Sequence, residues 1–270
     1  MKIATWNING VKARIDSLLR WLGETKPDVV CLQEIKTVDE GFPREAIEGL
    51  GYNIAVHGQK GFHGVAVLSL RPFDEVKPRL AGDPADAQSR YLEVCVPHEG
   101  GSIRVASIYL PNGNPIGTEK FTYKLAWFER LRKHASALLQ HEEVLVLAGD
   151  FNVIAQPEDA HDPAAWAGDA LYQPESRAAW RRLTHLGFTD AIAATHPGGG
   201  HYTFWDYQAG AWAKDRGIRI DHLLLSPRAA DRLRVAGIDR MTRGWDKPSD
   251  HVPVWVELGS ASESDRRPIG

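Results

Sequence analysis

The sequence predicts an α/β fold in which two mixed β-sheets pack face to face and helices cover the outside. The first observation is that strand-like apolar runs interleave with helical patterns along the whole chain, and many of these runs are hairpin-like neighbours. The second is that short polar segments follow several apolar runs, where side chains at strand ends reach the rim of a sheet. The 270 residues are 43% hydrophobic, which is enough to bury a large core.

The predicted elements follow one another in chain order. Apolar runs predict strands at 2–5, 28–32, 64–68, 90–96, 103–109, 144–148, 202–205, 218–225 and 252–258. Helical spacing of apolar residues predicts helices at 14–24, 118–140 and 176–186. In the first helix Ile15, Leu18 and Leu22 share one face, and Lys26-Pro27 ends it.

No low-complexity linker or short repeat divides the chain, so we predict a single domain over residues 1–258. Segment 156–174 is rich in Pro, Asp, Ala and Trp and has little periodicity, and a loop of that length is usually functional or mobile. Residues 259–270 are polar and lack an apolar period, which predicts a disordered C-terminal tail.

Composition limits the classes of function. A formal net charge of -3 argues mildly against a nucleic-acid binder, although acidic metal ligands subtract charge where a local basic rim still faces phosphates. No span approaches the roughly 20 apolar residues that cross a bilayer, and the N-terminus leads directly into a strand without a secretory signal. Cys31 and Cys95 lie inside apolar runs, which favours buried free thiols in a reducing compartment. We therefore expect a cytoplasmic protein without a membrane partner.

Two early strand ends predict a metal site. Asn7 and Glu34 each follow an apolar run, and the two strands are expected to be neighbours. Taken singly, Asn7 fits turn chemistry and Glu34 fits a carboxylate that pairs with Lys36. Together, one carboxylate, one amide and several waters suit Mg²⁺, a hard cation that prefers oxygen ligands.

The segment Gly149-Asp150-Phe151-Asn152 is the strongest single motif. Gly149 allows a sharp turn, and Asp150 and Asn152 point to the same side in extended geometry because they are two residues apart. A carboxylate and an amide on one side suit a water-activating base and a donor to a phosphate oxygen. An Asx-turn explains the same residues equally well in isolation.

The segment Ser249-Asp250-His251 puts a histidine at the entrance of the last strand. A lone histidine is more often structural, but Asp221 is placed to orient and charge His251, and such a pair polarises toward a phosphoryl oxygen. The chain has no Gly-x-Ser-x-Gly elbow and no P-loop Gly-Lys-Ser/Thr. Covalent serine catalysis and nucleotide triphosphatase chemistry are therefore disfavoured.

Further substrate contacts are predicted beside these strand ends. Tyr109 and Asn112 can hydrogen-bond a phosphate, although a packed tyrosine and an Asn-Gly turn explain them as well. Phe204 and Trp205 can stack on a sugar or base, with ordinary core packing as the alternative. Basic residues near the strand ends are candidates for contacts to a phosphate backbone, with solvated surface as the alternative for most of them. They are Lys12, Arg14, Lys36, Lys60, Arg90, Lys120, Arg216 and Lys247.

The ordered set of motifs resembles the endonuclease/exonuclease/phosphatase superfamily. The residues that carry the resemblance are Asn7, Gln33-Glu34, Tyr109, Gly149-Asp150-x-Asn152, Arg219-Ile220-Asp221 and Ser249-Asp250-His251. Features that look like the exonuclease III branch are residues 58–61 (Gly-Gln-Lys-Gly), Arg90, residues 202–207 and residues 216–221. The resemblance covers residues 1–258. Single motifs are weak, but the ordered set is specific.

The resemblance implies a four-layer αββα sandwich and a Mg²⁺-dependent nuclease, with Mn²⁺ as a substitute metal. The implied substrate is double-stranded DNA with abasic sites or blocked 3′ ends. The implied reactions are hydrolysis of the phosphodiester 5′ to an abasic site, 3′-to-5′ exonuclease action and 3′-end cleaning. The resemblance also favours a monomer.

Family roles carry over to the matching positions. Glu34 is then the principal metal ligand, Asn7 assists it, and Asp250 lies at the metal site. Asp150 activates or positions the attacking water, and Asn152 holds that water and the phosphate.

The remaining roles concern the phosphate and the sugar. His251, oriented by Asp221, stabilises the transition state. Tyr109 and Asn112 bind the scissile phosphate. The residues that resemble the pocket for a flipped abasic sugar are Phe204, Trp205 and Ile218.

Two alternatives remain open at this point. A non-DNA phosphoesterase is disfavoured by the aromatic residues and the basic residues near the loops. A non-catalytic relative that binds RNA or protein would tolerate loss of metal ligands or of the Asp-His pair, and none is lost. His63 stands where Tyr, Asn or Ser is expected, and the loop 111–115 is one of several versions. Both leave the balance of exonuclease and endonuclease activity open.

Overall fold

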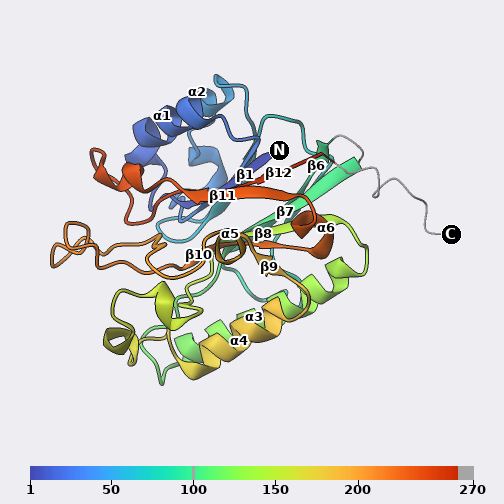
Figure 1. The fold of residues 1–270 in the computed structure, drawn as a ribbon. Coiled ribbons are helices and arrows are strands. Elements are labelled where there is room, and N and C mark those ends of the chain that lie inside the picture. Colours follow the sequence, from blue (N-terminus) through green and yellow to red (C-terminus); the bar gives the residue numbers. More distant parts are fainter. Residues whose placement is uncertain (99–100, 261–270) are drawn as a thin grey trace.

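A computed structural model describes residues 1–98 and 101–260, and two six-stranded sheets form its centre (Figure 1). The first sheet has the strand order β11-β12-β1-β2-β4-β3, and the second has the order β5-β6-β7-β8-β10-β9. The strands of the first sheet are β1 (Lys2–Asn7), β2 (Val29–Gln33), β3 (Asn53–His57), β4 (Val65–Ser69), β11 (Leu233–Ile238) and β12 (Val254–Leu258). Those of the second are β5 (Glu75–Pro78), β6 (Tyr91–His98), β7 (Gly101–Tyr109), β8 (Val144–Asp150), β9 (Thr189–Asp190) and β10 (Asp221–Leu225).

Helices cover both outer faces of the paired sheets. The α-helices are α1 (Ile15–Thr25), α2 (Arg44–Glu48), α3 (Glu119–Leu139), α4 (Pro174–Thr184), α5 (Ala191–Thr195) and α6 (Pro227–Ala230). In Figure 1, α1 and α2 lie above the first sheet, and α3 and α4 lie below the second. The predicted four-layer αββα sandwich is confirmed.

Three hydrophobic clusters separate the four layers. Ile3 and Val94 belong to the cluster between the sheets. Trp127 and Phe128 of α3 pack on the outer face of the second sheet, and Trp21 of α1 packs on the first. Because central strands are covered on both faces, they are apolar without strict alternation, as every residue of β2 and β8 is buried.

The predicted helices begin and end close to the expected residues. Lys26 ends α1 in the left-handed conformation (φ 43°), and its N–H donates to Leu22 O. Thr118 caps α3, since its side chain accepts a hydrogen bond from Lys120 N.

The structure differs from the sequence prediction in its short elements. Segment 202–205 is no strand, because Phe204 makes only isolated bridges to Ile218 and His251. The ladder of β10 begins at Asp221 rather than at Ile218. Strands β3, β5 and β11 were missed. All three are partly exposed edge strands, so they lack the fully buried apolar run that marks the central strands.

The predicted tail falls almost entirely outside the described residues, which end at 260; Gly259 N still donates to Arg232 O (2.8 Å). The predicted turn at 99–101 also lies partly outside them. Among the described residues, no helix is both long and apolar enough to span a membrane.

Candidate active site

The polar strand ends meet at one edge of the sandwich because of the strand directions. Strands β1 and β2 are parallel, as are β7 and β8, so their carboxyl ends share an edge. β10 runs antiparallel to β8 and starts at that edge. In the second sheet Asp150 pairs in register with Tyr109 on one side and with Asp221 on the other. These three side chains therefore share one face, which points toward the first sheet.

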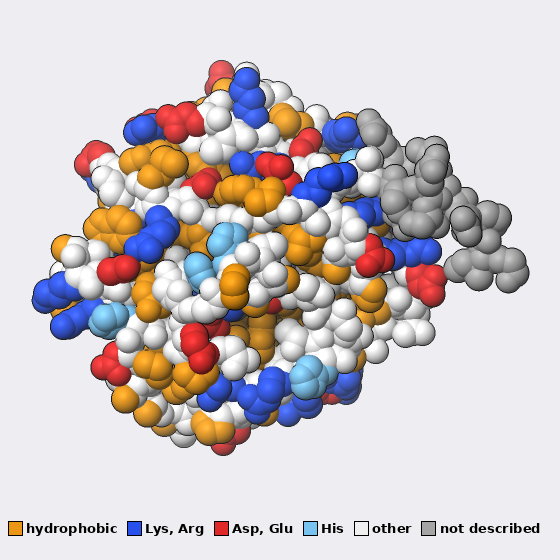
Figure 2. All heavy atoms as spheres, in the orientation of Figure 1, with side chains coloured by type: hydrophobic (Ala, Val, Ile, Leu, Met, Phe, Trp, Pro, Cys, Tyr) orange, Lys and Arg blue, Asp and Glu red, His pale blue; other side chains and the backbone are white. Residues whose placement is uncertain are grey.

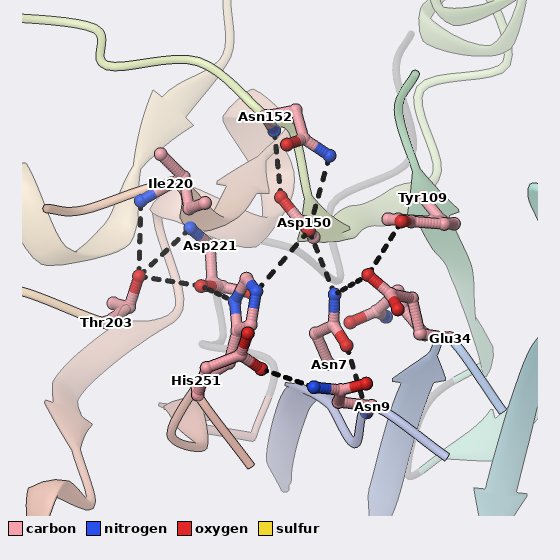
Figure 3. A network of polar contacts seen from close by, with 12 residues as sticks. Asn7, Asn9, Glu34, Tyr109, Asp150, Asn152, Thr203, Ile220, Asp221 and His251 are labelled. Atoms are coloured by element: carbon pink, nitrogen blue, oxygen red, sulfur yellow. Dashed lines mark hydrogen bonds and ion pairs between the residues drawn. The ribbon is translucent and has the colours of Figure 1, made fainter. Parts of the chain in front are cut away.

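Asn7 of the first sheet connects the two sheets at this edge (Figure 3). Its Nδ2 donates to Glu34 Oε1 (3.1 Å) and to Asp150 Oδ2 (3.0 Å). Its Oδ1 accepts from Asn9 N (3.1 Å), and its backbone oxygen accepts from Ser249 Oγ (2.7 Å). One buried amide thus fixes two carboxylates that lie 116 residues apart in the sequence, from 34 to 150.

Glu34 is held as a carboxylate that faces the cleft. Its backbone is left-handed (φ 50°), which turns the side chain out of the strand direction. Oε1 accepts from Tyr109 Oη (2.7 Å), and Oε2 lies 3.0 Å from Lys36 Nζ. Burial alone would raise the pKa of Glu34, but Tyr109, Lys36 and Asn7 together lower it. The group is therefore ionised at neutral pH.

Asp150 and Asn152 form a tight turn at the end of β8. Asn152 N donates to Asp150 Oδ1 (2.9 Å), and Asn152 Nδ2 donates to Leu110 O (2.9 Å). Asn112 Nδ2 donates to Asn152 Oδ1 (3.1 Å). Asp150 is 2% exposed, and burial raises its pKa although His251 opposes the shift. A carboxylate with a raised pKa is placed to exchange a proton near neutral pH.

His251 is oriented by a buried carboxylate. Its Nδ1 lies 2.8 Å from Asp221 Oδ2, and Thr203 Oγ1 donates to the same oxygen (2.7 Å). Nε2 lies 3.8 Å from Asp150 Oδ2 and so faces the cleft. Burial disfavours the imidazolium, but Asp221 outweighs burial and raises the pKa of His251 to about 10. Asp221 therefore keeps a cation beside Asp150.

The donor set fits a hard divalent cation. Glu34 offers a carboxylate. Asn7 offers its amide oxygen, which here accepts from Asn9 N while the amide nitrogen donates to Glu34. A second group of ligand atoms, from Asp150, Asp221 and His251, lies within 4.8 Å of one another. Asp221 Oδ1 is buried and has no hydrogen-bond partner among the described residues, so this group also retains a free acceptor.

Asp250 is connected to Glu34, a proposed metal ligand, through Asn9 and Lys36. Its Oδ1 accepts from Asn9 Nδ2 (2.9 Å), and Asn9 Oδ1 accepts from Lys36 Nζ (2.5 Å). Asn9 thus links Asp250 to the lysine that pairs with Glu34. Asp250 is therefore connected through Asn9 to the Glu34–Lys36 pair.

Of the three predicted pocket residues, Phe204 contacts His251, whereas Ile218 and Trp205 are buried. The ring of Phe204 lies 5.0 Å from that of His251, and Phe204 bridges to Ile218. Trp205 is fully buried, and its indole N–H donates to Asp215 Oδ1 (3.0 Å). It therefore packs behind the site instead of lining it.

Two of the eight basic residues predicted to contact a phosphate backbone, Arg90 and Lys120, lie in different surroundings. Arg90 is 7% exposed; its Nη1 donates to Tyr109 O (3.2 Å) and its guanidinium lies 4.7 Å from the centre of the Tyr109 ring. Arg90 thus supports Tyr109 from the side. Lys120 is exposed in the first turn of α3, and no contact of its side chain within the described residues joins it to the site.

Arg219, part of a predicted motif, is a structural residue. Its Nε lies 2.7 Å from Asp159 Oδ1, and its Nη1 lies 2.7 Å from Asp190 Oδ2. Because Asp159 belongs to segment 156–174, this buried pair fastens that predicted loop to the start of β10. The segment contains two short 3-10 helices, η3 (Pro157–Asp159) and η4 (Pro163–Trp166).

Three residues of the site escaped the sequence reasoning. Thr203 lies two residues before Trp205 and Asn9 lies two residues after Asn7, and this spacing was the available signal. Lys124 is fully buried and binds the backbone of two site residues. A lysine within a helix gives no such signal in sequence.

The sandwich fold and an edge of carboxylates, amides and an Asp-His pair define a hydrolase that acts on phosphate esters. The chain belongs to the Endonuclease/Exonuclease/phosphatase family, whose model matches residues 4–251. It is 34% identical to exodeoxyribonuclease III of Haemophilus influenzae over 96% of this chain and 100% of that protein, and 32% identical to an exodeoxyribonuclease of Bacillus subtilis over 94% and 98%.

Solved structures agree with the sequence relatives. A Neisseria 3′ phosphatase bound to a product DNA hairpin superposes with a TM-score of 0.92 at 34% identity, over 96% of this chain and 99% of that one. An AP endonuclease from Archaeoglobus fulgidus superposes with a TM-score of 0.91, also at 34% identity and with the same coverage.

Proposed function

We propose that this chain is a Mg²⁺-dependent DNA repair nuclease of the exodeoxyribonuclease III class. Its main reaction is hydrolysis of the phosphodiester 5′ to an abasic site in duplex DNA, accompanied by 3′-to-5′ exonuclease and 3′-end-cleaning activity. The relatives named above support the class, since they include two exodeoxyribonucleases, a 3′ phosphatase with bound DNA and an AP endonuclease.

One observation carries the proposal. The side-chain amide of Asn7 donates hydrogen bonds to Glu34, the proposed metal ligand, and to Asp150, the proposed general base, which lie on different sheets. Glu34 and Asn7 would hold the cation, with Asp250 beside them. When bound, the cation neutralises charge that develops on the phosphate. Mn²⁺ offers the same coordination chemistry and is a candidate substitute.

Asp150 and Asn152 at the end of β8, together with His251 just before β12, would handle the proton and the phosphate. Asp150 accepts a proton from the attacking water, while Asn152 holds that water and a phosphate oxygen. His251, charged by Asp221, donates a hydrogen bond to a non-bridging phosphoryl oxygen. Cleavage leaves a 3′-hydroxyl and a 5′-deoxyribose phosphate.

Substrate selection would rest on the surface beside His251. Phe204, which packs on the buried Ile218, would present an apolar face to an abasic sugar. Tyr109 and Asn112 would bind the scissile phosphate. Arg90 would support Tyr109, and Trp205 would pack behind the site. Lys120 is a candidate contact to the DNA backbone.

We further propose that the protein acts as a monomer in the cytoplasm, on nucleoid DNA. The substrate would be double-stranded DNA with abasic sites or blocked 3′ ends.

The decisive experiment is incision of an end-labelled duplex that carries one abasic-site analogue, in Mg²⁺ and again in EDTA. We expect a single metal-dependent cut 5′ to the lesion, with any ladder from the 3′ end reporting exonuclease action. Folded protein that cleaves in neither Mg²⁺ nor Mn²⁺ would contradict the proposal. Activity on inositol phosphates with none on DNA would instead identify a non-DNA phosphoesterase.

A further inference from the structure

Lys124 is a fully buried lysine on α3, close to the active-site edge of the second sheet. An ammonium group inside a protein is costly unless it is paired or fully hydrogen-bonded. Among the described residues, no carboxylate lies within ion-pair distance of its Nζ; its hydrogen bonds go to main-chain carbonyls. Because these carbonyls are its hydrogen-bond partners, the contacts indicate that the role of the lysine is to hold them in place.

The two carbonyls belong to two residues of the proposed site. Nζ donates to Asn112 O (2.9 Å) and to Asn152 O (2.5 Å). The side chains of the same residues are joined, because Asn112 Nδ2 donates to Asn152 Oδ1 (3.1 Å). One ammonium therefore fixes the backbones of two amides that reach the cleft from separate loops.

The neighbouring loop leaves room for the lysine stem. Gly113 has a positive φ (+90°), and a Cβ there would lie 2.6 Å from Lys124 Cδ. Burial lowers the pKa of Lys124 to about 7, although Asp150 and Asp169 oppose that shift. Asp150 is thus close enough to Lys124 to influence its charge without contacting it.

We propose that Lys124 is a positioning residue for the hydrolytic reaction, one that holds Asn112 and Asn152 in the geometry that addresses the phosphate and the water. This inference rests on the proposed function. Lys124 does not itself touch the DNA, because its side chain is enclosed by the protein. It acts through the two asparagines.

The test compares Lys124→Met with Lys133→Met. Methionine is close in length to lysine but donates no hydrogen bond, so two carbonyls lose their partner. Lys133 lies on the exposed face of the same helix and provides the matched control. We expect kcat for incision of abasic duplex to fall about 10- to 100-fold in Lys124→Met, with KM changed less than about threefold. The control should match the wild type.

A second readout does not depend on activity. The side-chain amide ¹H–¹⁵N signals of Asn112 and Asn152 should shift or broaden in Lys124→Met and stay unchanged in Lys133→Met. If the wild type fails to cleave DNA, the proposed function is wrong, and these signals still decide whether Lys124 positions the asparagines.

If Lys124→Met does not fold, Lys124→Gln keeps one donor, and the wild type itself can be measured. There, hydrogen-bond couplings should connect the Lys124 ammonium to the carbonyl carbons of Asn112 and Asn152. Unchanged kcat with unchanged amide signals overturns the inference. So does a rise confined to KM, because lost positioning of the groups that act in the transition state must lower kcat.

Discussion

Asn7 is the residue that joins the two halves of the site. Its amide nitrogen lies between Glu34 and Asp150, and two carboxylates that face one neutral donor create a place where positive charge is favourable (Figure 3). Lys36 and His251 approach the same carboxylates from opposite sides. The site is thus an array of fixed charges that the fold holds ready before substrate arrives.

Glu34→Gln removes the carboxylate of the proposed metal site while keeping its shape. We expect incision to fall roughly a thousandfold, because a bound metal contributes several kcal/mol to stabilising phosphate charge. Mg²⁺ should also cease to raise the melting temperature. Glu158→Gln makes the same change at an exposed position and should alter neither measurement. A Glu34→Gln protein with near-wild-type incision would refute the assignment.

The Asp221–His251 pair should make stability depend on pH. The folded state raises the pKa of His251 above its ordinary value of 6.5 to about 10, so the fold favours the protonated form. That stabilisation is fully present below pH 6.5 and is lost as pH rises through 10. Urea unfolding in EDTA from pH 6.5 to 10 should show a steeper loss in the wild type than in Asp221→Asn. Parallel curves would mean that Asp221 does not charge His251.

At the level of elements, the parallel pair β7 and β8 sets the distance between Tyr109 and Asp150. Gly149 pairs with Ile108 of β7, and a Cβ on Gly149 would lie 1.9 Å from Ile108 O. The glycine of the Gly-Asp-x-Asn motif is therefore needed for strand pairing as well as for the turn.

Gly149→Ala should separate these strands. We expect it to lower the free energy of unfolding by more than about 3 kcal/mol, because a backbone atom cannot move aside cheaply. Gly23→Ala is the matched control, since Gly23 lies on the exposed side of α1 with open space around it. That change should stabilise the protein by up to about 1 kcal/mol. Equal effects of the two substitutions in urea unfolding would exclude this account.

At the scale of the whole molecule, positive and negative charges nearly balance, with 32 Lys and Arg against 35 Asp and Glu. Figure 2 shows Lys and Arg side chains interspersed with Asp and Glu over the visible face. A net charge of -3 therefore says little about DNA binding, because phosphates meet only the local charges around the cleft.

DNA affinity should consequently fall with salt in spite of the negative net charge. For catalytically inactive Glu34→Gln protein, the logarithm of the binding constant should fall linearly with the logarithm of salt concentration. Lys60→Gln at the predicted rim should reduce that slope by about 1, whereas Lys133→Gln on the outer face of α3 should leave it unchanged. A slope near zero would contradict binding through the DNA backbone.

Prediction from sequence worked best where a local pattern has one structural meaning. The buried central strands and the long helices α1 and α3 were predicted because their apolar spacing extends over many residues. Segment 202–205 was predicted wrongly as a strand, because Phe204 and its neighbours have strand-like composition but meet only two isolated partners. Edge strands β3 and β5 were missed because they are short and partly exposed, so neither has the long buried apolar run of the central strands.

The sequence by itself determined the chemistry of the site: which carboxylates, amides and histidine stand at strand ends, and in what order. Only the tertiary structure decided their partners, because the parallel pairing of β1 with β2 and of β7 with β8 brings those ends to one edge. It also decided that Trp205 donates to Asp215 and Arg90 donates to Tyr109 O, and that Lys124 donates to two main-chain carbonyls. The physical reason is that burial and hydrogen bonds between distant segments depend on packing, which local residue patterns do not record.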